Sequence, residues 1–285
     1  MRLRQLTGMK SIADRLFVAL QYLLPRRWLS REMYYLTRCE VRVIKNSLIS
    51  IVRRLYRIDL SEAAIPDPHS YPSFNAFFTR ALRPGARPQP GTEDSIISPV
   101  DGTLSCFGYL DDQRLIQAKG QTYSVREFLG SASAAATYSG GAYATIYLAP
   151  GNYHRVHMPA AGQLKRTLRI PGDCFGVDAR SMRFISNLLV RNERVVTFFQ
   201  SPAGPLAVAL VGALMVGSIS LAVTEARKDL MPGMTLERGA ELGRFNMGST
   251  VIALFTKDRV QWSADLVVGQ SLLMGQEIGT IISEK

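Results

Sequence analysis

The sequence predicts an α+β fold in which amphipathic helices precede a mainly β domain of barrel or sandwich form. Two observations lead to this prediction. Apolar residues recur at helical spacing over the first 58 residues, and beyond residue 93 they occur in short runs separated by Gly, Pro, Asn or Asp. The 285 residues, 47% hydrophobic and 20% charged, can form one large core or two modest ones, which excludes a disordered tail or a disulfide miniprotein.

Two amphipathic helices are predicted at the N-terminal end. Each has an apolar stripe on one helical face, and Pro25 separates the two: Ile12, Leu16, Leu20, Leu23 and Leu24, then Val41, Ile44, Leu48, Val52 and Leu55. Four basic side chains of the second helix lie away from its stripe: Arg42, Lys45, Arg53 and Arg57. This pattern suits a helix in a membrane interface beside anionic lipid, or a helix that packs on the protein's own core. Amphipathicity alone does not separate these two alternatives.

The net charge of +11 is concentrated in this N-terminal region. Residues 1–58 hold thirteen Lys or Arg and three Asp or Glu, a net +10, whereas residues 59–285 carry +1. A nucleic-acid enzyme would more often spread basic charge around its site. We therefore expect residues 1–63 to form a membrane-association region whose partner is an anionic membrane surface, and we expect no nucleic-acid partner.

Cysteine usage and one long uncharged stretch bear on the cellular compartment. Cys39, Cys106 and Cys174 form no CxxC pair, which argues against a disulfide framework and a zinc ribbon and favours a reducing compartment. Residues 195–224 carry no charge and could span a membrane by length. Pro and Gly divide this stretch into strand-length pieces, so we favour buried strands over a transmembrane helix.

Two further regions follow the basic one. Residues 64–92 are predicted to be a connector with one short helix, because six of the fourteen prolines fall between residues 66 and 90 around the piece 74–80. Residues 93–285 are predicted to be the β-rich catalytic domain. Its apolar runs are 143–148, 195–199, 206–210, 251–255 and 260–268, and closely spaced glycines between 269 and 279 are typical of tight turns.

Three residues supply the acid, base and nucleophile types of a catalytic triad: Asp101, His157 and Ser249. His157 stands with His154 in Tyr153-His-Arg-Val-His-Met-Pro159, and Ser249 follows Gly248 in a Gly-Ser-Thr turn. Each piece taken alone could equally be structural, as a histidine packed at a strand end or an ordinary turn. A zinc site would need further ligands, and none stands at a recognisable spacing, so no metal is expected.

These motifs in this order resemble the phosphatidylserine decarboxylase proenzymes of bacteria and mitochondria. The similarity runs through most of the chain and combines the Tyr-His-Arg-Val-His-Met-Pro piece with the Gly-Ser-Thr turn. The matching pieces are 75–80, 99–102, 117–120, 153–159, 171–173, 191–195, 210–212, 216–218 and 243–250.

The resemblance implies a chain that cleaves itself between Gly248 and Ser249 and converts Ser249 into a covalent pyruvoyl cofactor. It implies that His157 is the base, Asp101 its orienting acid and His154 a substrate-binding residue. The pyruvoyl group would accept the electrons released with CO₂ as phosphatidylserine becomes phosphatidylethanolamine. The two cleaved chains would form a heterodimer, with a dimer of heterodimers left open. We expect attachment to the cytoplasmic face of a bacterial inner membrane in preference to the mitochondrial inner membrane.

The sequence departs from the family pattern at two places. Met247 replaces the usual leucine, a volume-conserving change that we expect to be harmless. Residues 220–237 lack the family's Trp-containing segment, which leaves the head group preference open. Two other function classes also stay open: a lipid-binding relative that never matures, and a serine hydrolase that uses Asp101 and His157 and keeps Ser249 internal.

Overall fold

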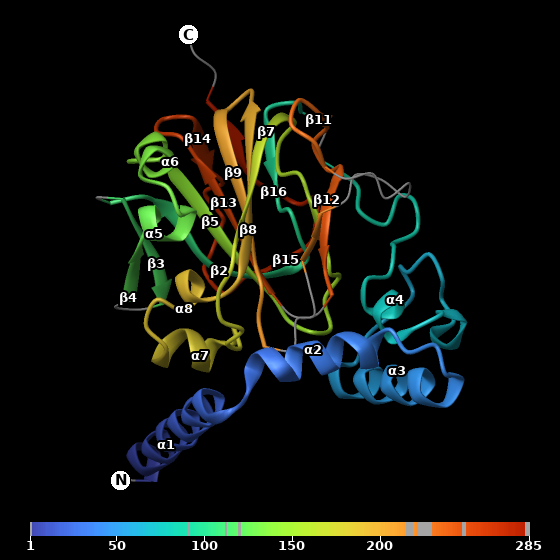
Figure 1. Cartoon of the computed structure of the whole chain (residues 1–285). Helices are drawn as coiled ribbons and strands as arrows, with labels where there is room; N and C mark the ends of the chain where they lie inside the picture. The colour runs from blue at the N-terminus through green and yellow to red at the C-terminus, as the bar shows by residue number, and fades with distance from the viewer. Residues whose placement is uncertain are drawn as a thin grey trace.

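The computed structural model describes residues 2–89, 92–111, 113–118, 121–214, 219–221, 230–246 and 249–282. Helices come first in the chain and a β-rich domain follows, so the predicted α+β class is confirmed. Figure 1 shows the N-terminal helices along one side of the β domain, with the described C-terminal end at the opposite side. The described strands form open sheets stacked as a sandwich and do not close into a barrel.

Three helices form the N-terminal region: α1 (Arg2–Leu23), α2 (Arg26–Thr37) and α3 (Arg42–Tyr56). The sequence predicted only two. Pro25 separates α1 from α2 because its ring cannot continue a helix. The additional helix, α2, carries mostly aromatic, basic and polar side chains, so it has no aliphatic stripe of the kind that predicted the other two.

The connector packs against α3. It contains the short helices η1 (Pro68–Ser70) and α4 (Phe74–Phe78), and the Ser73 hydroxyl caps α4 by accepting a hydrogen bond from the Ala76 N–H at 3.2 Å. A separate apolar core joins α3 to this connector: Ile49, Ile58, Leu60, Ala63, Tyr71, Phe74, Phe77 and Phe78. The division of the chain into regions 1–63, 64–92 and 93–285 stays a prediction.

The β domain is built on a central antiparallel sheet with the strand order β11-β7-β8-β9-β13-β5-β2-β15. The bounds in that order are Thr235–Leu236, Gly162–Ile170, Arg194–Ser201, Gly204–Val211, Ser249–Phe255, Ala142–Leu148, Gly102–Tyr109 and Ser271–Leu272. Two three-stranded sheets pack on one face through a shared core. They are β1 (Ser95–Ile97), β16 (Glu277–Ile281) and β14 (Val260–Trp262), and β10 (Ile219–Leu221), β12 (Glu241–Phe245) and β6 (Arg155–His157).

A second core covers the other face of the central sheet. It is formed with the hairpin β3 (Arg114–Ala118) and β4 (Gln121–Ser124), and with the helices α5 (Val125–Leu129), α6 (Ala132–Thr137), α7 (Ala179–Phe184) and α8 (Leu188–Arg191). Strand β9 shows the result, since Val208 and Leu210 enter the first core and Ala207 and Ala209 the second. A sheet buried on both faces needs apolar residues at every position, and this explains the uncharged stretch in the sequence.

The stretch 195–224 forms strands in its described part, namely most of β8, all of β9 and β10. The transmembrane alternative for this stretch is therefore wrong. Among the helices in the described ranges, none is long and apolar enough to cross a bilayer.

Candidate active site

The candidate catalytic residues lie around one end of strand β5. Ser249 is the first residue of β13 and pairs with Leu148, the last residue of β5. The chain then reverses in a tight turn, in which the Asn152 side chain accepts a hydrogen bond from the Ala149 N–H at 2.7 Å. Tyr153 and His154 follow this turn directly, so the end of one central strand brings the serine and the histidine motif to the same region.

Asp101 is buried just before β2, and its carboxylate is fully engaged. The Arg87 guanidinium donates to both oxygens, at 3.2 and 2.7 Å, and the Met274 N–H donates to one of them at 2.8 Å. Arg87 also donates to Glu62 at 2.7 Å. Burial alone would lower the pKa of Arg87, but its hydrogen bonds to Asp101 and Glu62 outweigh burial and raise that pKa. The Asp101 side chain is therefore held in place by three hydrogen bonds.

His157 ends strand β6 with both ring nitrogens in hydrogen bonds. Nδ1 lies 2.8 Å from the Gly239 carbonyl oxygen, and because a carbonyl only accepts, Nδ1 carries the hydrogen. Nε2 then has the lone pair and accepts from the Tyr153 hydroxyl at 3.0 Å. Burial lowers the pKa of His157, and the bond to Gly239 offsets this only in part. The ring is thus neutral at pH 7, the state that a general base requires.

His154 lies in a different environment from His157, although only two residues separate them. It is fully buried, its Nδ1 donates to the Asn152 carbonyl at 2.8 Å, and its ring centroid is 4.1 Å from that of Phe78. In the described part of the chain, Nε2 has no hydrogen-bond partner. Burial lowers the pKa of His154 to about 3, against the opposing hydrogen bond to Asn152. His154 therefore offers a free lone pair at neutral pH.

Ser249 is also completely buried, and among the described residues its hydroxyl has no hydrogen-bond partner. Buried hydroxyl groups in folded proteins almost always have a partner, so such a group indicates strain or chemistry. Gly248 and Met247, which precede it, lie outside the described residues.

Two of the predicted triad residues, Asp101 and His157, lie close together. The His157 N–H donates to the Pro99 carbonyl at 2.8 Å, which brings His157 beside the turn that carries Asp101. No hydrogen bond links the side chains of Asp101, His157 and Ser249 within the described ranges. The triad roles therefore stay a prediction.

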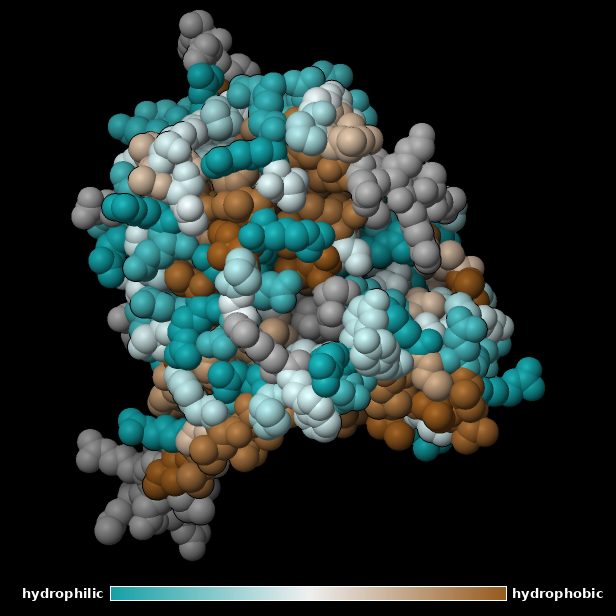
Figure 2. Space-filling model, viewed as in Figure 1, coloured by the Kyte–Doolittle hydropathy of each residue, from teal (hydrophilic) through white to brown (hydrophobic). Residues whose placement is uncertain are grey.

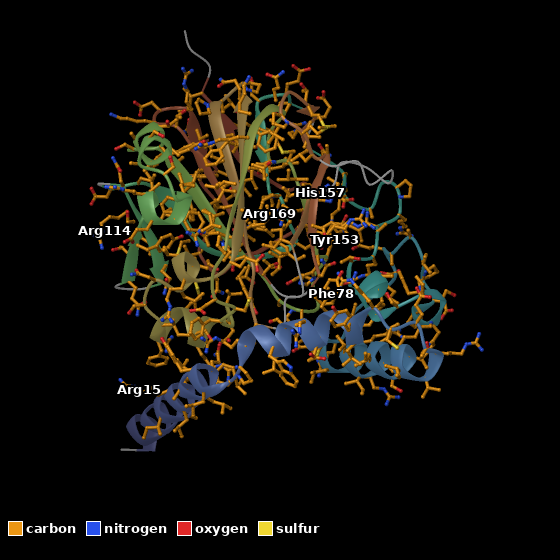
Figure 3. All side chains as sticks on the ribbon, viewed as in Figure 1. Arg15, Phe78, Arg114, Tyr153, His157 and Arg169 are labelled. Carbon is orange, nitrogen blue, oxygen red and sulfur yellow. The ribbon has the colours of Figure 1, made fainter. Side chains whose placement is uncertain are left out.

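A cavity of about 370 Å³ borders this site. Its lining includes Arg87, Tyr153, His157, Glu241 and Met274. Figure 3 shows Phe78, Tyr153 and His157 in the region between α4 and β12. Reasoning from sequence missed Tyr153 and Arg87 as site residues. Tyr153 stood inside the histidine motif and could have been suspected, but nothing in the sequence pairs Arg87 with Asp101.

Comparison with known proteins finds relatives that match nearly the whole chain. A family model described as phosphatidylserine decarboxylase matches residues 74–280, and one described as PSD matches residues 16–57. The chain is 44% identical to the phosphatidylserine decarboxylase proenzyme of Ectopseudomonas mendocina, over 93% of this chain and 98% of that protein. The proenzyme of Azotobacter vinelandii is 45% identical with the same coverage, and that of Nitrosococcus oceani is 44% identical over 95% of this chain and 93% of its own length.

Proposed function

This chain belongs to the phosphatidylserine decarboxylase family, and from that premise we propose that it converts phosphatidylserine to phosphatidylethanolamine and CO₂. We further propose that it does so with a pyruvoyl group made from its own Ser249. The observation that supports this most is the buried Ser249 hydroxyl, which has no partner in the described part of the chain and stands at the start of a strand directly after a glycine. A hydroxyl that is buried and has no hydrogen-bond partner among the described residues is what we expect of a residue that is itself converted into the pyruvoyl group.

Conversion of Ser249 requires groups of this chain and one water molecule. The Ser249 Oγ would attack the Gly248 carbonyl carbon while His157 Nε2 takes the hydroxyl proton. The bond from that carbon to the Ser249 nitrogen then breaks, the nitrogen receives the proton, and an ester remains. β-Elimination releases the Gly248 carboxylate and leaves a dehydroalanine at position 249, and water hydrolyses its imine tautomer to the pyruvoyl group with release of ammonia. Glycine at position 248 has no side chain to shield the attacked carbon. Once formed, the pyruvoyl group supplies a carbonyl that accepts the electron pair released with CO₂.

His154 has a separate role in this proposal. Because its Nδ1 donates to Asn152, its Nε2 can only accept a hydrogen bond. We assign to Nε2 the substrate's amino group, which would donate a hydrogen bond to this lone pair. The low pKa of His154 keeps this nitrogen unprotonated at neutral pH, so its lone pair can accept a hydrogen bond from the amine once the site is accessible.

Substrate access should depend on maturation. His154 and Ser249 have no exposed surface, so a lipid head group cannot touch either one in this uncleaved chain. Scission between residues 248 and 249 creates two new chain ends at that point. We propose that these ends separate and make the site accessible. We also propose that the two cleaved chains remain together as a heterodimer.

Peripheral membrane attachment is supported by the orientation of the N-terminal helices. Their large apolar side chains face outward: Ile12, Leu16, Leu20, Leu23, Val43, Ile51 and Leu55 are all more than half exposed. Their polar residues Gln21, Ser30, Thr37 and Lys45 are buried instead. Figure 2 shows this apolar surface along α1 and α3 on the lower side of the molecule. A helix in water would bury its leucines, so this arrangement favours the membrane-interface alternative.

The substrate and the membrane face complete the proposal. Exposed Arg53, Arg54 and Arg57 at the end of α3 would meet anionic head groups, among which phosphatidylserine itself carries a net negative charge. Because the relatives named above are bacterial proteins, we propose the cytoplasmic face of a bacterial inner membrane.

The test is CO₂ release from carboxyl-labelled phosphatidylserine by purified protein, with no pyridoxal phosphate or metal added. We expect turnover, and we expect borohydride to abolish it by reducing the carbonyl. Ser249→Ala is the matched inactive control. Full activity after borohydride, or a strict need for pyridoxal phosphate, would refute the pyruvoyl mechanism. Efficient turnover of soluble serine would keep the chemistry but refute the lipid assignment, a risk located in residues 220–237, of which 222–229 lie outside the described residues.

A further inference from the structure

Arg80 is a buried cation that forms no salt bridge with any carboxylate among the described residues. It directly follows the C-terminal end of α4 and is only 5% exposed. Its Nη2 donates to the Gly151 carbonyl at a long 3.3 Å, and among the described residues its Nη1 has no partner at all. Burial lowers the pKa of the Arg80 guanidinium, which reflects the loss of its hydration.

The other buried or half-buried arginines near Arg80 are paired with carboxylates. Three arginines are paired with three carboxylates: Arg87 with Asp101 and Glu62, and Arg155 and Arg244 with Glu241. Arg80 forms no salt bridge with any carboxylate in the described ranges. Its charge also helps to lower the pKa of His154, so it acts on the residue to which we assign the substrate's amino group. Among the described residues near the site, Arg80 is therefore the buried arginine that no carboxylate neutralises, whereas Arg83, which lines the cavity, is exposed.

A second buried arginine shows what a purely structural one looks like in this protein. Arg194 is 2% exposed, and its guanidinium donates to the carbonyls of Glu127, Phe128, Val190 and Asn192. Its hydrogens are used to join α5 and α8 to the sheet. Arg80 forms no comparable set of hydrogen bonds, although burying an unpaired charge destabilises a fold. A buried unpaired cation beside a reaction site is a candidate for anion binding.

Phosphatidylserine offers two anions, and the chemistry distinguishes them. The carboxylate leaves as neutral CO₂, so an ion pair to it would be stronger in the ground state than in the transition state and would slow the reaction. The phosphodiester keeps its charge throughout. We infer that Arg80 binds the phosphodiester of the lipid head group, with Nη1 as the donor, while His154 receives the amino group. This inference rests on the proposed function for the identity of the lipid.

The test compares Arg80→Met and Arg80→Lys with wild type in calorimetric titrations of short-chain phosphatidylethanolamine into the purified, self-processed protein. This lipid has the phosphodiester but no carboxylate. We expect Arg80→Met to weaken its binding at least tenfold and Arg80→Lys to weaken it less, because an ammonium keeps the charge but not the fork of donors. In turnover, KM for phosphatidylserine should rise by a larger factor than kcat falls.

Thermal unfolding separates this role from a structural one. Arg80→Met should keep or raise the melting temperature, because it removes an unpaired buried charge, whereas Arg194→Met should lower it. The inference is overturned if Arg80→Met lowers the melting temperature as Arg194→Met does. It is also overturned if phosphatidylethanolamine binds Arg80→Met as tightly as wild type. If wild type binds this lipid through Arg80 but releases no CO₂ from phosphatidylserine, the proposed function fails and the anion site stands.

Discussion

At the scale of single residues, hydrogen bonding gives the two histidines of one motif different chemistry. His157 has its Nε2 lone pair beside a tyrosine hydroxyl, whereas His154 has an Nε2 with no partner in the described part of the chain. Both rings are neutral at pH 7 because burial lowers both pKa values. We assign self-cleavage to His157 and amine binding to His154, so substitutions of the two residues should have different effects.

His157→Ala should slow self-cleavage by about 10²- to 10⁴-fold, the usual contribution of a general base. Asp101→Asn should slow it less, because the Asp101 carboxylate bonds Arg87 and Met274 and acts on His157 only through its charge. The measurement is the fraction of cleaved chain against time, by mass spectrometry. Tyr153→Phe keeps the ring that stacks on His157 and frees Nε2, so it should cleave at least as fast as wild type.

Processing of both His157→Ala and Asp101→Asn at the wild-type rate would show that the triad assignment is wrong. Tenfold slower cleavage of Tyr153→Phe would mean that the tyrosine hydroxyl relays the Ser249 proton to His157 and does not merely block the Nε2 lone pair.

The pKa of His154 predicts a pH dependence of stability. The unfolded chain takes up a proton near the ordinary pKa of 6.5, whereas the folded chain resists protonation until about 3. As pH falls from 6.5 toward 3, the free energy of unfolding should therefore decrease, with up to ~1.4 kcal/mol per pH unit from this residue. Denaturant titrations at several pH values measure the slope. His154→Gln should flatten it; an equal slope in the variant would contradict the buried, neutral histidine.

At the scale of the elements, α3 connects the proposed membrane surface to the active site. Its Lys45 is buried, and the ammonium donates to the carbonyls of His69 and Tyr71 at 2.8 and 2.7 Å. The other end of α3 abuts the turn before His154, since a Cβ added to Gly151 would lie 3.2 Å from the Tyr56 carbonyl oxygen. A helix lying on the membrane would thus border the turn that holds the substrate residue.

Lys45→Met should lower the free energy of unfolding by about 2 kcal/mol, because two carbonyls, one of them buried, lose a charged donor. Arg53→Met on the same helix is the control, and as an exposed change it should stay within about 0.5 kcal/mol of wild type. Urea denaturation measures both. Equal stability of the two variants would mean that Lys45 does not fasten α3 to the connector.

The outward apolar face predicts how the protein binds vesicles. Ile51→Glu combined with Leu55→Glu should strongly reduce sedimentation with anionic vesicles, whereas Leu273→Glu, at an exposed leucine of the β domain, should not. Salt should release wild type only in part, because ionic screening weakens the arginine contacts and leaves the apolar insertion. Binding that is indifferent to the two glutamates, or to the presence of anionic lipid, would contradict the proposed surface.

At the scale of the whole molecule, the sequence predicted what depends on local pattern and missed what depends on tertiary pairing. Strands β8 and β9 were predictable because burial on both faces leaves a continuous apolar run. The exposed side of α3 was not: Leu48 and Val52 of the predicted stripe pack against the core, and Ile51, outside that stripe, is exposed. The sequence also could not show that Arg80 forms no salt bridge among the described residues. The pairing of arginines with carboxylates depends on segments that are far apart in the chain.

The most direct test of the whole account is the intact mass of purified, folded protein. Scission after Gly248 divides the 285 residues into chains of 248 and 37 residues. We predict both chains for wild type, with a blocked N-terminus on the shorter one whose mass corresponds to a pyruvoyl group in place of serine. Ser249→Ala should give a single chain. A folded wild-type protein that remains one chain of 285 residues, or a shorter chain that begins with a free serine, would contradict the account.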